Sequence, residues 1–225
     1  MQERNTPLTA AELLRDSAIR TYIERADASL AALGYTDHSY SHVGTVAERA
    51  GALLATLGYP ERTCELARIA GLLHDVGNMV NRVGHSQSGA LLAFRLLEDR
   101  GMPPAEVAEV VTAIGNHDEG EGAPISELAA ALILADKSDV RRTRVRNTDP
   151  ASFDIHDRVN YSAISSALTV NPDEGHVTLS LTIDTAVSPV LDYFDIFLER
   201  MRLCRHAARR LSLAFGLVIN NSRLL

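Results

Sequence analysis

A histidine–aspartate pair at the end of an apolar helix is the feature that most constrains the fold of this chain. His74 and Asp75 follow the apolar residues 69–73, and the spacing of apolar side chains predicts a helix over residues 63–73. A buried carboxylate beside an imidazole is costly unless its charge is compensated, commonly by a metal ion. Taken alone, however, such a dipeptide is more often a hydrogen-bonded pair that closes a helix.

Further histidines and one further aspartate extend this pattern along the chain. His42 heads a predicted amphipathic helix, His85 opens another, and His117 ends a fourth; Asp136 lies inside a fifth, apolar helix. One ligand-type side chain from each of several helices is how a helical bundle builds a metal site in its core. The sequence therefore predicts a mainly α-helical bundle with a metal site at its centre.

The order of these residues resembles a known family. Four of them match the defining pattern of the HD superfamily of metal-dependent phosphohydrolases: His42, His74, Asp75 and Asp136. Two more, His85 in Gly-His-Ser-Gln-Ser-Gly-Ala and His117 in Gly-Asn-His-Asp-Glu-Gly, resemble the extra histidines of its two-metal branches. The nearest patterns are those of the bacterial diadenosine tetraphosphate hydrolases and, more distantly, the HD-GYP cyclic-dinucleotide phosphodiesterases. The resemblance covers residues 36–145.

This resemblance implies a site for two divalent metal ions. The first ion would be held by His42, His74, Asp75 and Asp136, and the second by His85 and His117, with Asp75 as the bridge. A metal-activated water would then attack phosphorus. Imidazole-rich sites favour iron or manganese, with cobalt, nickel or magnesium as further candidates. The alternative for His85 and His117 is an ordinary polar residue at a helix end.

Other polar residues near this pattern are weaker candidates. His38 precedes His42 by four residues, so both share a helix face if the helix begins early. It is a candidate for supporting a ligand or protonating the leaving group, and the alternative is an exposed loop position. Lys137, next to Asp136, is a candidate catalytic residue, and both Lys137 and Asp139 are candidates for contact with substrate phosphates.

An arginine-rich segment follows the predicted helix over residues 125–140. Its members are candidates for binding substrate phosphate, because a guanidinium pairs well with phosphate oxygens: Arg141, Arg142, Arg144 and Arg146. The equally weighted alternative is a solvated helix end favoured by the helix dipole. Three acids in the preceding loop, Asp118, Glu119 and Glu121, are candidates for positioning water or an ion, but a charged surface loop is the simpler interpretation.

Composition limits the compartment and the partners. The net charge of −7 disfavours non-specific nucleic-acid binding, and 46% hydrophobic with 23% charged residues is ordinary for a globular protein. Two cysteines, Cys64 and Cys204, lie in apolar helical contexts and give no disulfide framework. No apolar run reaches the ~20 residues of a membrane span, and residues 1–5 lack a signal-peptide core. We expect a cytoplasmic protein without membrane contact.

The remaining elements predict a helical part, residues 1–148, followed by a small α/β extension, residues 149–225. A capping box at Thr9 begins a helix that keeps its apolar spacing to Leu33. In the extension, residues 162–170 and 176–183 predict a β-hairpin, Ser188-Pro189 opens a long helix with serine as N-cap, and residues 215–220 form a last strand. The apolar long helix and the sheet edge make a homodimer an expectation.

The expected activity is hydrolysis of a phosphoester or phosphoanhydride bond in a small nucleotide. Diadenosine tetraphosphate is the first candidate substrate and a nucleoside phosphate the second. Cyclic-dinucleotide cleavage is disfavoured, because the loop at His117 has one histidine where the HD-GYP enzymes have two, and it lacks their Gly-Tyr-Pro. Two other classes stay open: a di-iron oxygenase built on the same ligands, and a nucleotide sensor without turnover.

Overall fold

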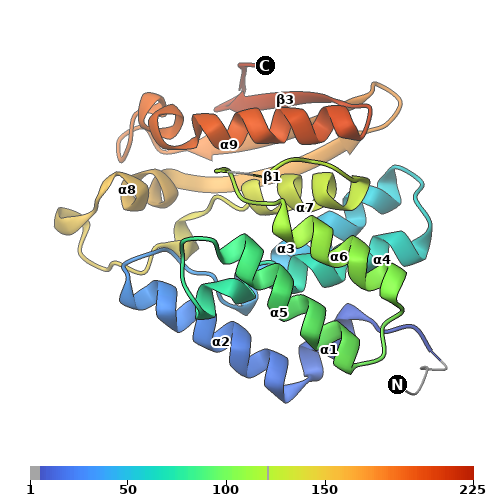
Figure 1. Ribbon diagram of the computed structural model, residues 1–225. Helices are drawn as coiled ribbons and strands as arrows, with labels where there is room; N and C mark the ends of the chain where they lie inside the picture. Colours follow the sequence, from blue (N-terminus) through green and yellow to red (C-terminus); the bar gives the residue numbers. More distant parts are fainter. Residues whose placement is uncertain (1–5, 121) are drawn as a thin grey trace.

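The computed structural model describes residues 6–120 and 122–225, and its helices α1 to α7 form a bundle (Figure 1). Their bounds are α1 Ala10–Arg15, α2 Ser17–Ala32, α3 Tyr40–Thr56, α4 Glu61–Leu73, α5 His85–Asp99, α6 Pro104–Gly115 and α7 Glu127–Lys137. A 3₁₀ helix, η1 (Val76–Met79), continues the chain after α4. The prediction of a mainly helical fold is confirmed.

The predicted helix from Thr9 to Leu33 is two helices. The capping box is present, since Thr9 accepts from the Glu12 amide and Glu12 accepts from the Thr9 amide. The helix then breaks at Asp16, whose carboxylate accepts from the amides of Ala18 and Ile19 and so caps α2. Arg100 also donates to this carboxylate, which ties the break to the end of α5.

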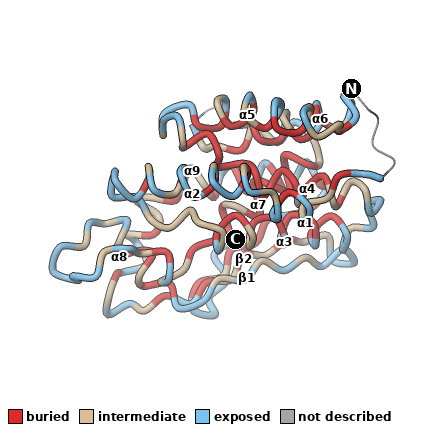
Figure 2. The backbone as a smooth tube through the Cα atoms, turned by 90° about the horizontal axis from the view of Figure 1, so that it is seen from below, coloured by how far each residue is buried: buried red, intermediate tan, exposed pale blue. Residues whose placement is uncertain are grey.

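Helix α7 is the centre of the bundle. Residues 128–135 are all buried, and Figure 2 shows the buried stretches gathered along α7 and α4. Ser126 caps its N-terminus by accepting from the Ala129 amide. A helix that is apolar all round must be covered on every side, here by α3, α4, α6 and the C-terminal helix α9 (Val190–Arg210). It ends at Lys137, three residues before the predicted end.

The C-terminal part carries a four-stranded sheet beside α9. The strands are β1 Ala163–Asn171, β2 His176–Ile183, β3 Ala214–Ile219 and β4 Ser222–Arg223. They lie in the order β1-β2-β3-β4, with β2 and β3 parallel and the other pairs antiparallel. Because parallel neighbours need a long connection, α9 makes the crossover from β2 to β3. The predicted hairpin and last strand are confirmed.

Three details of this part differ from the sequence-based expectation. A helix, α8 (Ile155–Ser162), precedes the hairpin, and short 3₁₀ helices η2 (Arg142–Arg144) and η3 (Pro150–Ser152) lie before it. Strand β4 was also not predicted. The N-cap of α9 is Pro189, and the Ser188 hydroxyl instead donates to the Asp192 carboxylate. Ser188 therefore supports the first turn of α9 through a side chain rather than a backbone amide.

The two parts share one apolar core. Buried residues of α9 and the sheet belong to the same hydrophobic cluster as those of the bundle, and α9 with the sheet forms a layer on one side of it (Figure 1). The division at residue 148 and the homodimer stay predictions. Cys64 and Cys204 are buried free thiols. Across the described residues, no helix has the length and apolarity to cross a membrane.

Gly71 sets the distance between α3 and α4. A Cβ at this position would lie 2.6 Å from the Ala47 Cα and 2.7 Å from the Ala47 nitrogen, so only glycine fits without moving α3. The close approach brings the His74 ring, one turn along α4, to 5.3 Å from the His42 ring of α3. The packing of these helices therefore places two of the predicted ligands side by side.

We predict that Gly71→Ala lowers the free energy of unfolding by about 1–3 kcal/mol, because the added methyl group must push two backbones apart. The matched control is Gly44→Ala in α3, where a Cβ would meet nothing within 4 Å. There the loss of glycine's flexibility should stabilise the protein by about 0.5–1 kcal/mol. Urea unfolding of both variants measures the difference, and equal effects of the two substitutions would contradict this account.

Candidate metal centre

The six side chains predicted as metal ligands converge at the centre of the bundle. They come from the first turn of α3, the end of α4, the start of α5, the loop after α6 and the end of α7: His42, His74, Asp75, His85, His117 and Asp136. All are buried except Asp136, whose side chain is 12% exposed. Neighbouring imidazole rings lie 5.0–5.3 Å apart from His42 through His74 and His117 to His85.

The four histidines are oriented in the same way. In each, Nδ1 lies within hydrogen-bond distance of an oxygen that can only accept: Asp139 Oδ2 for His42 (2.8 Å), Gly71 O for His74 (2.8 Å), Arg82 O for His85 (3.1 Å) and Ile114 O for His117 (2.6 Å). Nδ1 therefore carries a proton, and Nε2 is the atom that faces the centre; in His85 this Nε2 lies 3.3 Å from Arg82 Nη1, which a metal ion there would displace. Metal-binding histidines are typically held by such a bond on their other nitrogen.

Two carboxylates face the Nε2 atoms of His42 and His74. Asp136 Oδ1 lies 3.3 Å from His42 Nε2, and Asp75 Oδ2 lies 3.3 Å from His74 Nε2. His42 Nε2 also lies 3.5 Å from Asp75 Oδ2, and His74 Nε2 lies 3.7 Å from Asp136 Oδ1. Ligand atoms about 2.0–2.2 Å from one ion have separations of this size. The four residues thus surround one position that suits a divalent cation.

Three atoms at this position lack any partner in the described part of the chain. His42 Nε2, His74 Nε2 and Asp75 Oδ2 are buried and make no hydrogen bond. Buried polar atoms are nearly always paired, so three unpaired atoms that converge on one point need an explanation. A metal ion bound by all three satisfies them at once, and the donor set therefore fits such an ion.

The second carboxylate oxygen of Asp75 faces His85. Asp75 Oδ1 lies 3.7 Å from His85 Nε2, and His117 forms a second ligand-type group with His74 and Asp75. The Asn78 amide donates to the same oxygen at 2.8 Å. Asp75 therefore stands between two sets of ligand-type side chains, one oxygen toward each, as a bridging carboxylate would.

The charges at the centre favour a bound cation. Burial would raise the pKa of Asp75, but its histidine neighbours outweigh burial and hold it well below the ordinary value. Burial would lower the pKa of His74, but Asp75 and Asp136 raise it to about 10. Burial and positive neighbours lower the pKa of His117 to about 3, so that imidazole is neutral. The carboxylates thus require positive charge here, which a proton on His74 or a metal ion supplies.

A family comparison agrees with this geometry. The model of the HD domain family matches residues 39–141, the segment that holds all six of these residues. Over these residues, which are just under half of the chain, the protein is similar to an HD domain. No curated protein matches the chain. The domain therefore supports metal-dependent hydrolase chemistry in general, and its substrate has to be sought in the residues around the metal centre.

Asp139, just after α7, holds the imidazole ring of His42 in place. Its carboxylate accepts from His42 Nδ1, is fully buried, and is itself bound by Arg141 Nε at 2.8 Å. Burial would raise the pKa of Asp139, but His42 and the nearby arginines hold it well below its usual range. Sequence analysis assigned Asp139 to phosphate binding; its spacing of three residues from Asp136 was the available signal that both lie on one side of the helix end.

His38 and Lys137 both border the metal centre. His38 Nδ1 donates to the Thr36 carbonyl at 2.7 Å, and its ring lies 5.2 Å from that of His42. Burial lowers the pKa of His38 well below its ordinary value. Lys137 Nζ pairs with Asp136 Oδ2 at 2.8 Å and with Glu119 Oε2 at 3.2 Å. His38 is therefore not an exposed loop residue, and Lys137 contacts the free oxygen of a candidate ligand.

The predicted phosphate-binding arginines separate into different environments. Arg144 is buried and lines the cavity above the metal centre. Arg141 is bound to Asp139 and Ser41, and Arg142 stacks 4.4 Å over the Tyr161 ring. Arg141 and Arg142 are absent from the described lining of the cavity. Arg146 pairs with Asp27.

The acidic loop is only partly at the surface. Glu119 is more than a plain surface acid, because its partly buried carboxylate lines the cavity between Lys137 and Arg200 of α9, 2.7 Å from Arg200 Nε. The Asp118 side chain is 32% exposed, with Oδ1 4.0 Å from His85 Nε2. Glu121 lies outside the described residues. Sequence analysis missed Arg200, since nothing in α9 distinguishes it from its neighbouring arginines.

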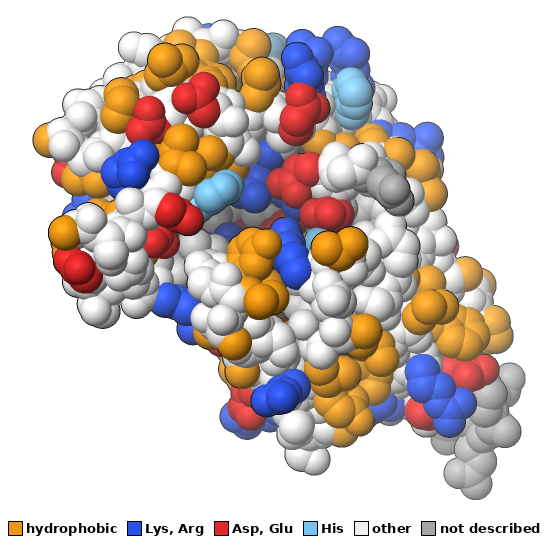
Figure 3. Space-filling model, turned by 60° about the vertical axis from the view of Figure 1, so that its left-hand side comes forward, with side chains coloured by type: hydrophobic (Ala, Val, Ile, Leu, Met, Phe, Trp, Pro, Cys, Tyr) orange, Lys and Arg blue, Asp and Glu red, His pale blue; other side chains and the backbone are white. Residues whose placement is uncertain are grey.

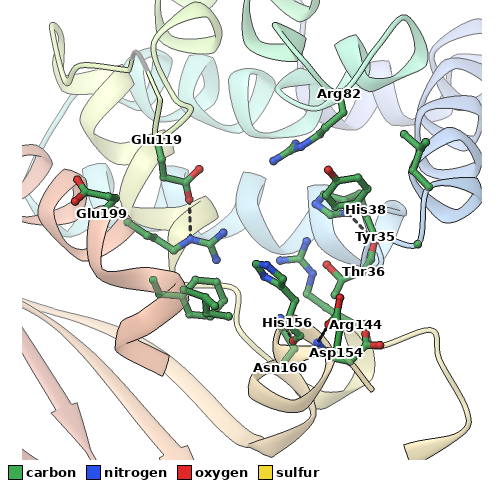
Figure 4. Close-up of a pocket in the computed structure, with 16 residues that line it drawn as sticks. Tyr35, Thr36, His38, Arg82, Glu119, Arg144, Asp154, His156, Asn160 and Glu199 are labelled. Atoms are coloured by element: carbon green, nitrogen blue, oxygen red, sulfur yellow. Dashed lines mark hydrogen bonds and ion pairs between the residues drawn. The ribbon is translucent and has the colours of Figure 1, made fainter. Parts of the chain in front are cut away.

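A cavity of about 570 Å³ opens above the metal centre. The space-filling view shows a hollow ringed by acidic, basic and histidine side chains (Figure 3). Its lining includes Arg82, Arg144 and His156, and the close-up shows the side chains of the first two entering from different sides (Figure 4). A smaller pocket of about 30 Å³ lies directly on the candidate ligands. Substrate therefore has room beside the metal centre.

We predict that Asp139→Asn lowers metal affinity about 10- to 100-fold, because an amide holds the His42 ring less firmly and leaves Arg141 without a carboxylate. Asp149→Asn, at an exposed loop position, is the matched control and should bind metal as the wild type does. Competition against a fluorescent chelator measures both. Equal affinity of the two variants would show that Asp139 does not position His42.

Proposed function

We propose that this protein is a metal-dependent phosphohydrolase that cleaves a phosphoester or phosphoanhydride bond of a small nucleotide at a two-metal site. The observation that carries the proposal is the Asp75 carboxylate, buried with one oxygen toward His42 and His74 and the other toward His85. Iron or manganese is the proposed metal, because the donor set is rich in imidazole. Diadenosine tetraphosphate and nucleoside phosphates are the candidate substrates.

Each residue near the metals has a role in this reaction. The ions, when bound, activate a water and neutralise charge on the phosphoryl group. Asp139 fixes the His42 ring, and Lys137 neutralises the outer oxygen of Asp136. His38 donates a hydrogen bond from Nδ1 to the Thr36 carbonyl. Its Nε2 is therefore available to accept a proton from the attacking water and to pass it to the leaving group. His38 lines both cavities, where this transfer would take place.

Substituting Asp75 should have the largest effect. We predict that Asp75→Ala loses both metal ions and at least about 1,000-fold in kcat/KM, because the bridge is removed and Asp136 alone is left to balance the charge of two ions among the six candidate ligands. His85→Ala and His117→Ala should keep about one metal per chain and lose less activity. Metal quantitation of freshly purified variants, with circular dichroism to confirm folding, tests this. Full metal content in Asp75→Ala would overturn the assignment.

A panel of nucleotides and phosphate esters, assayed with iron, manganese, cobalt and magnesium, tests the activity itself. We expect metal-dependent release of phosphate or of a shorter nucleotide by the wild type, and none by Asp75→Ala. Metal-dependent oxygen consumption would point instead to the oxygenase alternative. Tight nucleotide binding without turnover under any of these metals would favour a sensor.

A further inference from the structure

Three arginines from distant parts of the chain meet where the large cavity joins the metal centre. Arg82 precedes α5, Arg144 ends η2 and Arg200 lies in α9. These three residues and His38 line both the cavity of about 570 Å³ and the small pocket on the candidate ligands. A substrate that reaches the metals from the cavity must pass between them.

Arg144 and Arg200 are each anchored on one side and free on the other. Arg144 donates from Nε to the Asp37 carbonyl and from Nη1 to the Asp139 carbonyl, at 2.9 and 2.7 Å. Arg200 donates from Nε to Glu119 and lies 4.1 Å over the Phe197 ring. Arg144 Nη2 and both Arg200 Nη atoms make no hydrogen bond to any described residue, and none is sealed from solvent. These donors are held in place and available to a ligand.

In the lining of the small pocket, four basic side chains, Arg82, Lys137, Arg144 and Arg200, outnumber the two carboxylates, Asp75 and Asp136. Arg82 contacts Asn78, His85 and the Tyr35 ring but, among the described residues, no carboxylate. Arg200 and Lys137 share the Glu119 carboxylate. The Asp139 carboxylate is likewise shared by several cations, namely Arg49, Arg141 and Arg144. Bound metal ions would add to this excess, so a ligand with several negative charges is required to balance it.

We propose that Arg82, Arg144 and Arg200 bind a second phosphate group next to the one on the metals, so that the substrate is a nucleoside carrying two or more linked phosphates. The inference rests on the proposed function for the position of the first phosphate. Guanidinium groups held at one end bind phosphate oxygens in pairs with high selectivity. A nucleoside monophosphate would leave these donors without a partner.

The outer part of the cavity suits the nucleoside. Its volume is within the range of about 300–1,000 Å³ usual for small-molecule sites. Polar side chains of α8 and its N-cap line it, among them Asp154, Asp157 and Asn160, which accept hydrogen bonds as ribose hydroxyls and base amino groups require. His156 and Asn160 face the cavity across from Arg82 (Figure 4). The C-terminal part of the chain thus supplies much of the wall that would contact the nucleoside.

Calorimetric titration of the full chain as purified tests the proposal without turnover. The probes are adenosine monophosphate, the non-hydrolysable α,β-methylene analogue of adenosine diphosphate, and methylenediphosphonate alone. We expect the analogue to bind about 10-fold or more tightly than the monophosphate, since charged hydrogen bonds of this kind are lost without the second phosphate. Arg82→Gln and Arg200→Gln should bring this ratio close to one.

The control is Arg142→Gln, which removes an equal charge from a guanidinium that stacks on Tyr161 outside the cavity and should leave the ratio unchanged. Arg200→Lys, which keeps the charge but loses the paired donors, should give an intermediate ratio and guards against misfolding of Arg200→Gln. Equal binding of the two adenine nucleotides to the wild type, or an unchanged ratio in both Gln variants, would overturn the proposal.

The remaining outcomes separate this inference from the proposed function. If methylenediphosphonate binds as tightly as the nucleotide analogue, the phosphate assignment stands and the nucleoside part is wrong. If the arginine variants lower the preference for the diphosphate analogue over the monophosphate as expected, but no phosphate ester is hydrolysed, the binding site stands and the hydrolase proposal fails. If esters are hydrolysed but the ratio is one, the hydrolase proposal stands and the arginine site is overturned.

Discussion

The burial of the Asp75 carboxylate is the constraint on which the rest of this structure depends. A carboxylate taken out of water between imidazoles must be met by positive charge, or the fold loses more than it gains by packing. The bundle directs every surrounding histidine through Nε2, with Nδ1 bound to an oxygen of the protein, so that a proton or a metal ion held by these Nε2 atoms supplies the positive charge. Gly71 lets α4 approach α3 closely enough for this arrangement. The close packing of α3 and α4 therefore also sets the positions of the candidate metal ligands.

The same demand for charge balance links the metal centre to the C-terminal helix. Lys137 pairs with the outer oxygen of Asp136 and also with Glu119, which in turn holds Arg200 of α9. This chain of alternating charges is mostly buried, so removing one member leaves its neighbours unpaired in the interior. The position of α9 is consequently tied to a candidate metal ligand by ion pairs as well as by the shared apolar core.

Sequence predicts best the residues whose roles are set by local structure. The apolar spacing of α3 to α7 could be read directly from the sequence. Three candidate ligands lie at the ends of these helices, where the same spacing places them near the core: His42, His74 and His85. Asp16 was missed as a helix break because the apolar spacing continues past it, and its contact with Arg100, 84 residues away, could not be read from the sequence. The pairing of Glu119 with Arg200 was missed for the same reason, since the two residues lie 81 positions apart.

The candidate metal ligands and most of the residues that line the large cavity lie on different sides of the boundary of the family match. All six candidate ligands lie within residues 39–141, whereas in the described lining of the large cavity only Arg82 and Glu119 do. The other lining residues come from the α2–α3 loop and from residues after 141, including α8 and α9. The segment similar to an HD domain therefore holds the candidate metal ligands but few of the residues that line the cavity. If the proposed function holds, substrate choice depends on the segments around that domain, and a change there would alter specificity while leaving the candidate ligands intact.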